Sequence, residues 1–152
     1  MQRGRRLAFD VGTARIGVAV CDPDGILATP LQRIERNGAE LDSVRALLEE
    51  LEPVAIYIGL PINLEGKFTQ STYDAVYFAE DIEELTNTRV RMIDERLSTR
   101  AAQAQMHSAG KTVKSSKDWI DSASAVEILE RALEVLKAGR EAGKPVASYS
   151  DE

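Results

Sequence analysis

Short apolar runs alternate with turn signals over the first part of the chain. Leu7–Phe9 is a continuous apolar run that ends in a carboxylate, Asp10, and Ile16–Val20 resumes the run after a glycine-containing link. Two such runs joined by a short link predict a β-hairpin, and the absence of polar positions in the first run predicts a strand that is buried on both faces. After the turn signal Cys21–Gly25, the segment Ile26–Ile34 predicts a third strand, so the chain begins with an antiparallel meander.

Helical spacing then alternates with further apolar runs. Apolar residues recur every three or four positions over Leu41–Leu51 and predict an amphipathic helix, which Pro53 ends. The uninterrupted apolar run Val54–Ile58 predicts a buried fourth strand. A second helix over Tyr73–Thr86 and a fifth strand over Thr88–Ile93 follow. A helix between two such strands implies a parallel crossover.

The last third of the chain predicts a short helix over Thr99–Ser108, a polar loop over Gly110–Lys117 and a long helix from Asp118 to about Ala138. From Gly139 the chain is polar and contains glycine and proline, which is typical of a frayed end. We therefore predict one α/β domain over residues 1–138 and a disordered C-terminal tail over residues 139–152. Its central sheet has five strands, a three-stranded antiparallel meander plus two parallel strands, and helices flank it.

Composition narrows the class of protein. The 152 residues include one cysteine and one histidine, so an intrachain disulfide is impossible, a reducing compartment is favoured and the usual zinc sites are not expected. No apolar run approaches the length of a membrane span, and we expect a cytoplasmic protein with no membrane partner. The net charge of −6 argues against a protein that coats nucleic acid by charge alone, although a local basic groove remains compatible with it.

Asp10 is the first candidate for chemistry, because it lies within a strand that is expected to be buried. A carboxylate in such a place costs free energy unless it has a partner or a metal ion. The alternative is that Asp10 begins the turn and bonds its own backbone. Two further carboxylates, Asp94 and Glu95, end the fifth strand. Adjacent residues on a strand face opposite ways, so only one can point with Asp10, and the longer Glu95 is our choice.

Asp121 is the third candidate acid. It lies four residues before Ala125 and seven before Ile128, so it extends the buried stripe of the last helix by one turn. A carboxylate on the packed side of a helix favours a recessed site. Simpler alternatives stay open for both later acids. Asp94 and Glu95 can stabilise the dipole of the following helix, and Asp121 can belong to a capping box.

Polar and basic side chains are expected around these acids. The loop Gly59–Gly66 leaves the fourth strand at its carboxyl end, where open α/β sheets usually bind ligands. The loop Gly110–Lys117 leads into the helix of Asp121. Each loop has a plain alternative, as a strand-to-helix connection or as a linker. We expect contacts with a nucleic-acid substrate from Thr13, Arg15, Asn63, Lys67, Arg96, Ser98, Thr99, Lys111, Lys114 and Lys117.

Four segments resemble the motifs of one family in order and spacing. They are Asp10–Val20, Gly59–Gly66, Asp94–Thr99 and Ile120–Ala125, and the family is YqgF (RuvX), which has an RNase H-like fold. Its members are candidate pre-16S rRNA nucleases and homologues of Holliday junction resolvases. The resemblance extends nearly to Leu136. The chain departs from the family where residues 67–70 read Lys-Phe-Thr-Gln instead of small residues.

The resemblance implies an activity and its site. It places catalytic acids at Asp10, Glu95 and Asp121, which would hold Mg²⁺ or Mn²⁺, and a pair of such ions suits phosphodiester hydrolysis. The implied enzyme is a metal-dependent endonuclease for 5′-end maturation of pre-16S rRNA, which binds structured RNA as a monomer or a homodimer. It remains open whether Asp118 replaces or assists Asp121.

Two other functions remain open at this point. One is a Holliday junction resolvase that acts on branched DNA, and the other is a non-catalytic RNase H-like module that binds nucleic acid. Actin-like ATPases and sugar kinases also begin with a strand–Asp–Gly–Thr hairpin, but they need a second half with an adenosine site, for which 152 residues leave no room.

Overall fold

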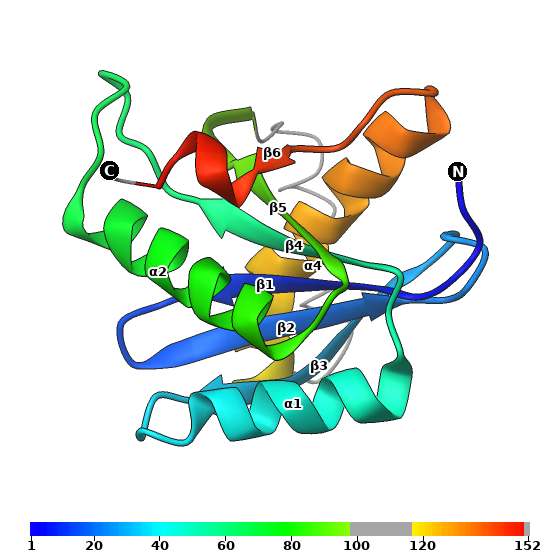
Figure 1. Ribbon diagram of the computed structural model, residues 1–152, viewed down its shortest axis with the longest axis horizontal. Coiled ribbons are helices and arrows are strands. Elements are labelled where there is room, and N and C mark those ends of the chain that lie inside the picture. The colour runs from blue at the N-terminus through cyan, green and yellow to red at the C-terminus, as the bar shows by residue number, and fades with distance from the viewer. Residues whose placement is uncertain (98–116, 151–152) are drawn as a thin grey trace.

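Six strands form one mixed sheet in the computed structural model, which describes the backbone of residues 1–97 and 117–150 and the side chains of residues 1–96 and 122–150 (Figure 1). The strands are β1 (Arg6–Val11), β2 (Arg15–Cys21), β3 (Ala28–Glu35), β4 (Ala55–Leu60), β5 (Arg89–Asp94) and β6 (Lys144–Pro145). Their order across the sheet is β3-β2-β1-β4-β5-β6. Strands β1, β4 and β5 run parallel to one another, and the remaining pairings are antiparallel.

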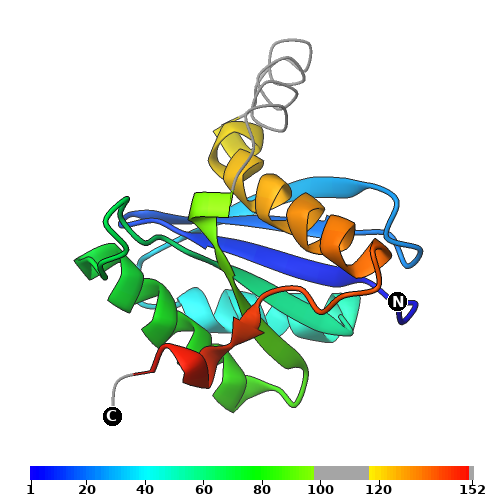
Figure 2. The same ribbon diagram turned by 90° about the horizontal axis from the view of Figure 1, so that it is seen from above.

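Helices cover both faces of this sheet. The long helix α4 (Lys117–Lys137) lies across one face, and helices α1 (Glu40–Leu51) and α2 (Gln70–Leu85) lie on the other (Figure 2). Two single turns of 3-10 helix complete the described elements, η1 (Glu95–Leu97) after β5 and η2 (Val146–Ser148) after β6. In the parts of the chain that the structure describes, no helix is long and apolar enough to span a membrane.

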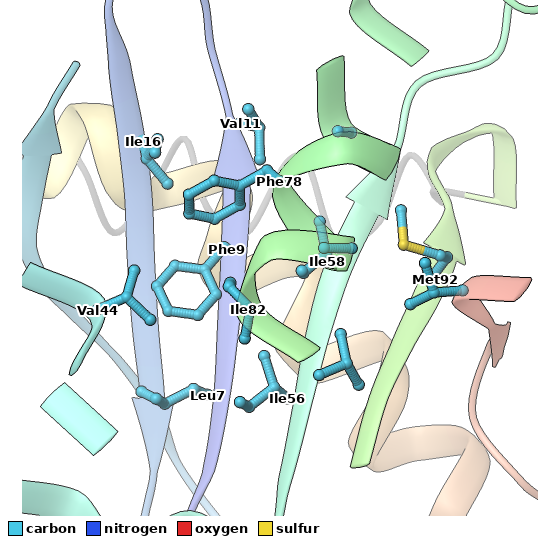
Figure 3. Packing of buried hydrophobic residues seen from close by; sticks show 14 of the residues in the cluster. Leu7, Phe9, Val11, Ile16, Val44, Ile56, Ile58, Phe78, Ile82 and Met92 are labelled. Atoms are coloured by element: carbon cyan, nitrogen blue, oxygen red, sulfur yellow. The ribbon is translucent and has the colours of Figure 1, made fainter. Parts of the chain in front are cut away.

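Successive side chains of the central strands point to opposite faces of the sheet and form two separate hydrophobic cores. On β1, Leu7 and Phe9 point toward α1 and α2, where Phe9 meets Phe78 of α2 edge-to-face at a ring-centroid distance of 5.9 Å (Figure 3). Ala8, between them, points toward α4. The α4 face is lined by small buried residues from the sheet and from α4 itself: Ala8, Ala19, Ala28, Ala55, Ala125 and Ala132. Small side chains on both sides let α4 lie close to the sheet.

The five strands and the long helices that the sequence predicts are confirmed, with ends shifted by a few residues. The short helix expected over Thr99–Ser108 lies outside the described residues. The prediction of a disordered tail from residue 139 is wrong for residues 139–150, which pack on the domain. Part of this segment adds a sixth strand to the predicted five. Lys144–Pro145 pairs with β5, and Val146 is fully buried.

This C-terminal segment stays on the domain because it completes the edge of the sheet. The guanidinium of Arg91 on β5 donates hydrogen bonds to the carbonyls of Ala142 and Gly143. Val146 and Tyr149 pack against the core beneath α2. Val146 and Tyr149 are isolated apolar residues in a polar segment. Their presence indicated packing against the domain, which the overall composition of the segment did not.

Ser122 fixes the position of α4 over the sheet. The pairing of β2 with β3 shifts register between Ile16 and Val18. At this irregularity the Val18 N–H donates to the Ser122 hydroxyl at 3.0 Å, and that hydroxyl donates to the Leu31 carbonyl at 2.8 Å. Ser122 is completely buried, so its hydroxyl satisfies the buried Val18 N–H and also binds the Leu31 carbonyl.

Replacing Ser122 by alanine should lower the free energy of unfolding by about 1–3 kcal/mol, because the buried Val18 N–H and the Leu31 carbonyl lose their partner. Urea unfolding of the variant and of the parental protein measures this difference. Ser43→Ala, an exposed serine on α1, is the matched control and should change stability by about 0.5 kcal/mol or less. Equal effects of the two substitutions would show that the Ser122 bridge contributes nothing.

Candidate active site

Strand register brings two of the three predicted acids to one edge of the sheet. Parallel strands end at the same edge, and the pairs Phe9–Ile58 and Leu60–Asp94 set the register there. Asp10 lies one residue beyond Phe9, and Glu95 lies one residue beyond Asp94. Asp10 lies two residues after Ala8, so the two-residue period of β1 points it toward the α4 face. The Glu95 carboxylate lies on the same face, beside Ile128 of α4.

Glycines on both sides of Asp10 leave room for carboxylates. Asp10 pairs with Gly17 of β2, and on β4 the residue after Ile58 is Gly59. A Cβ atom placed on Gly59 would lie 2.5 Å from Oε2 of Glu95 and 2.6 Å from Cδ1 of Ile128 on α4. The Glu95 carboxylate therefore occupies space that any side chain at position 59 would fill, between β4 and α4.

Burial raises the pKa values of both acids, and repulsion adds to this effect at Glu95. Burial raises the pKa of Asp10, and a hydrogen bond with Ser124 of α4 lowers it in part. For Glu95, burial is the larger cause, and the negative charge of Asp10 adds to it, so that its pKa rises to about 7. Two carboxylates whose ionisation is disfavoured in this way suit a cation that would restore their charge.

Asp94 faces away from this pair, as strand alternation predicts. Its carboxylate accepts hydrogen bonds from Arg96, with Oδ2 at 2.7 Å from Nη2, and this pairing lowers the pKa of Asp94. Of these two adjacent acids, Glu95 is the one that lies near Asp10, and its choice as a catalytic residue stays a prediction. Arg96 in turn lies against the loop after β4, because a Cβ on Gly66 would be 3.4 Å from its Nη1.

The described side chains that are predicted to contact substrate are of two kinds. Some are exposed to solvent, and one already makes hydrogen bonds within the protein. Thr13 and Lys67 are exposed, and exposed Arg15 lies 3.9 Å from Glu35 in a loose ion pair. Asn63 differs, because its side-chain oxygen accepts the backbone N–H groups of Glu65 at 3.0 Å and Lys67 at 2.9 Å. Asn63 thus shapes the loop that presents Lys67.

Several predicted residues cannot be placed in this site. The backbone of α4 includes Asp121, one turn before Ser124, but its side chain lies outside the described residues. The same holds for the side chain of Lys117 and for the remaining predicted contacts, Ser98, Thr99, Lys111 and Lys114. Among the described side chains, no three His, Cys, Asp or Glu residues form a group that could hold a metal ion. Asp10 and Glu95 supply carboxylate oxygens of the kind that Mg²⁺ and Mn²⁺ prefer.

Sequence reasoning missed two charged residues of α4 beside the acids. Burial raises the pKa of Glu127, Arg131 lowers it, and the charge of Asp10 raises it further. Arg131 Nη2 lies 3.9 Å from Oε1 of Glu127. The signal was present, since Ser124, Glu127 and Arg131 follow one another at helical spacing on the side of the helix that carries Ile128.

A concavity of about 370 Å³ lies on the opposite face, beside α1 and α2. Its only described cation, Arg36, binds Asp74 at 2.5 Å and Glu40 at 3.5 Å. Further carboxylates of Asp42 and Asp81 leave the lining negative. This concavity therefore repels phosphate and does not compete with the α4 face as a site for nucleic acid.

Solved structures with the same fold include RuvC of Thermus thermophilus. One RuvC structure matches with a TM-score of 0.62 at 13% identity, and RuvC in complex with a Holliday junction substrate matches with 0.59 at 15%. Each match covers 93% of this chain and 99% of the other. The meander, the two parallel crossovers and the covering helix α4 thus define an RNase H-like α/β fold, as the sequence predicts.

Sequence comparison makes the assignment specific. The family model RuvX, described as Holliday junction resolvase, matches residues 4–135, and the chain belongs to this family. A protein of Clavibacter sepedonicus is 44% identical over 95% of this chain and 90% of its own. One of Corynebacterium jeikeium is 47% identical over 84% of each chain. Both bear the name "Putative pre-16S rRNA nuclease". The family is one of nucleases, which confirms the enzyme class.

Glu95→Gln should stabilise the protein above pH 7 by about 1–3 kcal/mol. The folded protein keeps the Glu95 proton up to a pKa of about 7, whereas the unfolded chain releases it near 4.5. Stability from this group is therefore complete below pH 4.5 and is lost as the pH rises to 7. Glutamine does not titrate, so this loss disappears. Urea unfolding in EDTA at pH 5 and pH 8 measures it.

Glu134→Gln, at an exposed position of the same helix, is the control and should leave the pH dependence of the parental protein intact. If Glu95→Gln lost as much stability between pH 5 and pH 8 as the parental protein does, the carboxylate would not be buried and repelled in the way described.

Proposed function

We propose that this protein is a divalent-metal-dependent endonuclease that hydrolyses a phosphodiester bond in precursor 16S rRNA during 5′-end maturation. Asp10, Glu95 and Asp121 are its proposed catalytic acids and the proposed ligands of two Mg²⁺ or Mn²⁺ ions. The observation that carries the proposal is the convergence of Asp10 and Glu95 beside α4, in space that Gly59 leaves open. Ribosomal RNA is processed in the cytoplasm, where we place the protein.

The carboxylates would act through their charge and position. Metal ions bound to them would activate a water molecule and stabilise the charge on the leaving oxygen. Asp10 is oriented by the hydrogen bond with Ser124. The Glu95 carboxylate and the Ile128 side chain both lie against Gly59, which places the carboxylate at the end of β4 beside α4. With a pKa of about 7, Glu95 holds its proton for half of the time at neutral pH until a cation favours the ionised form.

Exposed cations beside this edge would hold the nucleic-acid backbone. Arg15 after the β1–β2 turn and Lys67 on the loop after β4 are both exposed. Such contacts position a substrate without reading its sequence. We propose the same role for Arg96 and for Lys111, Lys114 and Lys117.

RNA is the favoured substrate because the relatives named for pre-16S rRNA share more sequence identity with this chain than RuvC does. The proteins named for pre-16S rRNA are 44% and 47% identical over most of both chains, whereas RuvC is 13–15% identical. Branched DNA is the second candidate, because the family description names a Holliday junction resolvase. Junction resolution needs two cuts and hence a dimer, whereas a single cut in RNA needs one site, so we favour a monomer for the RNA reaction.

Asp10→Asn should reduce cleavage of a 16S rRNA precursor by at least about 100-fold, because the variant loses a charged oxygen at the reacting centre. The experiment compares both proteins on this RNA and on a four-way DNA junction, with EDTA and then with added Mn²⁺. EDTA should abolish activity and Mn²⁺ should restore it in the parental protein. Asp42→Asn, an exposed aspartate on α1, is the control and should cleave at the parental rate.

Each contrary outcome has a definite meaning. Cleavage by Asp10→Asn at the parental rate would remove the carboxylate site from the proposal. Activity that survives EDTA would remove the metal. Faster cutting of the junction than of the precursor would replace the RNA substrate by branched DNA.

A further inference from the structure

One stripe of α4 brings a positive charge to the acidic edge of the sheet. Ser124, Glu127 and Arg131 follow one another at spacings of three and four residues, so they share one side of the helix. Ser124 reaches Asp10, and the neighbouring Ile128 contacts the space above Gly59 beside the Glu95 carboxylate. These contacts fix the rotation of α4 about its axis and direct the stripe toward the two acids.

Arg131 is shielded from solvent at this place. Its side chain is 14% exposed, and that of its partner Glu127 is 18% exposed. A guanidinium so enclosed is costly to bury unless negative charge surrounds it. Glu127 lies at 3.9 Å, and the field of Arg131 also reaches Glu95 and Asp94. The other nearby described guanidinium, that of Arg96, is bound to Asp94 at 2.7 Å and is itself exposed.

Without Arg131, no cation among the described residues would offset the negative charge of the carboxylates beside α4. Asp10, Glu95 and Glu127 are partly buried carboxylates on this side of α4: Asp10 meets Ser124, Glu95 lies beside Ile128, and Glu127 pairs with Arg131. Asp94 is neutralised by Arg96, so Arg131 is the remaining cation among the described residues that faces the group. A cation that compensates carboxylates necessarily repels a second cation that binds the same carboxylates.

We propose that Arg131 is the resident counter-ion of the acidic site: held by Glu127, it neutralises the carboxylates before a divalent cation binds and thereby weakens the affinity of the site for that cation. This inference rests on the proposed metal-dependent function. Arg131 is a positioning residue here, because it acts through Glu95 and Glu127 and need not touch the substrate. Glu127 has the opposite effect, since it adds negative charge to the same place.

The test uses the full-length protein and Mn²⁺ alone as the probe. Arg131→Gln should bind Mn²⁺ about three- to ten-fold more tightly in titration calorimetry, because a repelling charge is removed. In EDTA the same variant should melt several degrees lower, because the acids lose their compensation. Glu127→Gln should bind Mn²⁺ about three- to ten-fold more weakly. The double variant should lie within about two-fold of the parental protein if the two charges offset each other.

Two controls separate this role from general effects. Lys137→Gln removes one positive charge from the exposed last turn of the same helix, and it should change Mn²⁺ affinity less than about two-fold. Arg131→Lys keeps the charge and should restore both the Mn²⁺ affinity and the melting temperature that Arg131→Gln alters. Failure of lysine to restore them would mean that the shape of arginine matters rather than its charge.

The outcomes distinguish this inference from the function on which it rests. Weaker or unchanged Mn²⁺ binding by Arg131→Gln would overturn the counter-ion role, even if the enzyme proved metal-dependent. If the parental protein bound no Mn²⁺, the proposed function would fail, and melting in EDTA would still test the counter-ion. An Arg131→Gln variant as stable as the parental protein would then exclude compensation of the acids by Arg131.

Discussion

Close approach of helix α4 to the sheet is the constraint on which the site depends. Alanines on the sheet and on the helix allow this approach, and the missing side chain of Gly59 extends it to the carboxyl ends of the strands. A methyl group at position 59 would overlap both the Glu95 carboxylate and the side chain of Ile128. The packing of the domain and the position of its acids therefore rest on the same run of small residues.

The same constraint sets the electrostatics. Because α4 excludes water from the edge of the sheet, Asp10 and Glu95 are held where their charged forms are poorly solvated and repel each other. These buried carboxylates lower the stability of the fold at this edge. The opposite face packs large apolar side chains around Phe9 and Phe78. The protein thus combines one conventional apolar core with one face on which partly buried carboxylates gather, and perturbed carboxylates of this kind are common at enzyme sites.

The sequence predicted the fold well where the hydrophobic pattern was strong. The continuous apolar runs of β1 and β4 and the periodic stripe of α4 were clear signals, and β5 ends with Asp94 turned away from Glu95. The sequence did not predict β6, because its two residues have no hydrophobic period of their own and pair with the edge that β5 offers. Glu127 and Arg131 escaped notice because a charge pair on a helix usually faces solvent, and only the rotation of α4 reveals otherwise.

The central claim is that Asp10 and Glu95 form one cation site between β4 and α4. Anomalous diffraction from crystals grown with Mn²⁺ tests it most directly, because the signal locates the metal without reference to activity. The account predicts an anomalous peak within coordination distance, about 2.0–2.3 Å, of carboxylate oxygens from both Asp10 and Glu95, on the α4 side of Gly59. A peak at another place, or no peak between these carboxylates at saturating Mn²⁺, would contradict it.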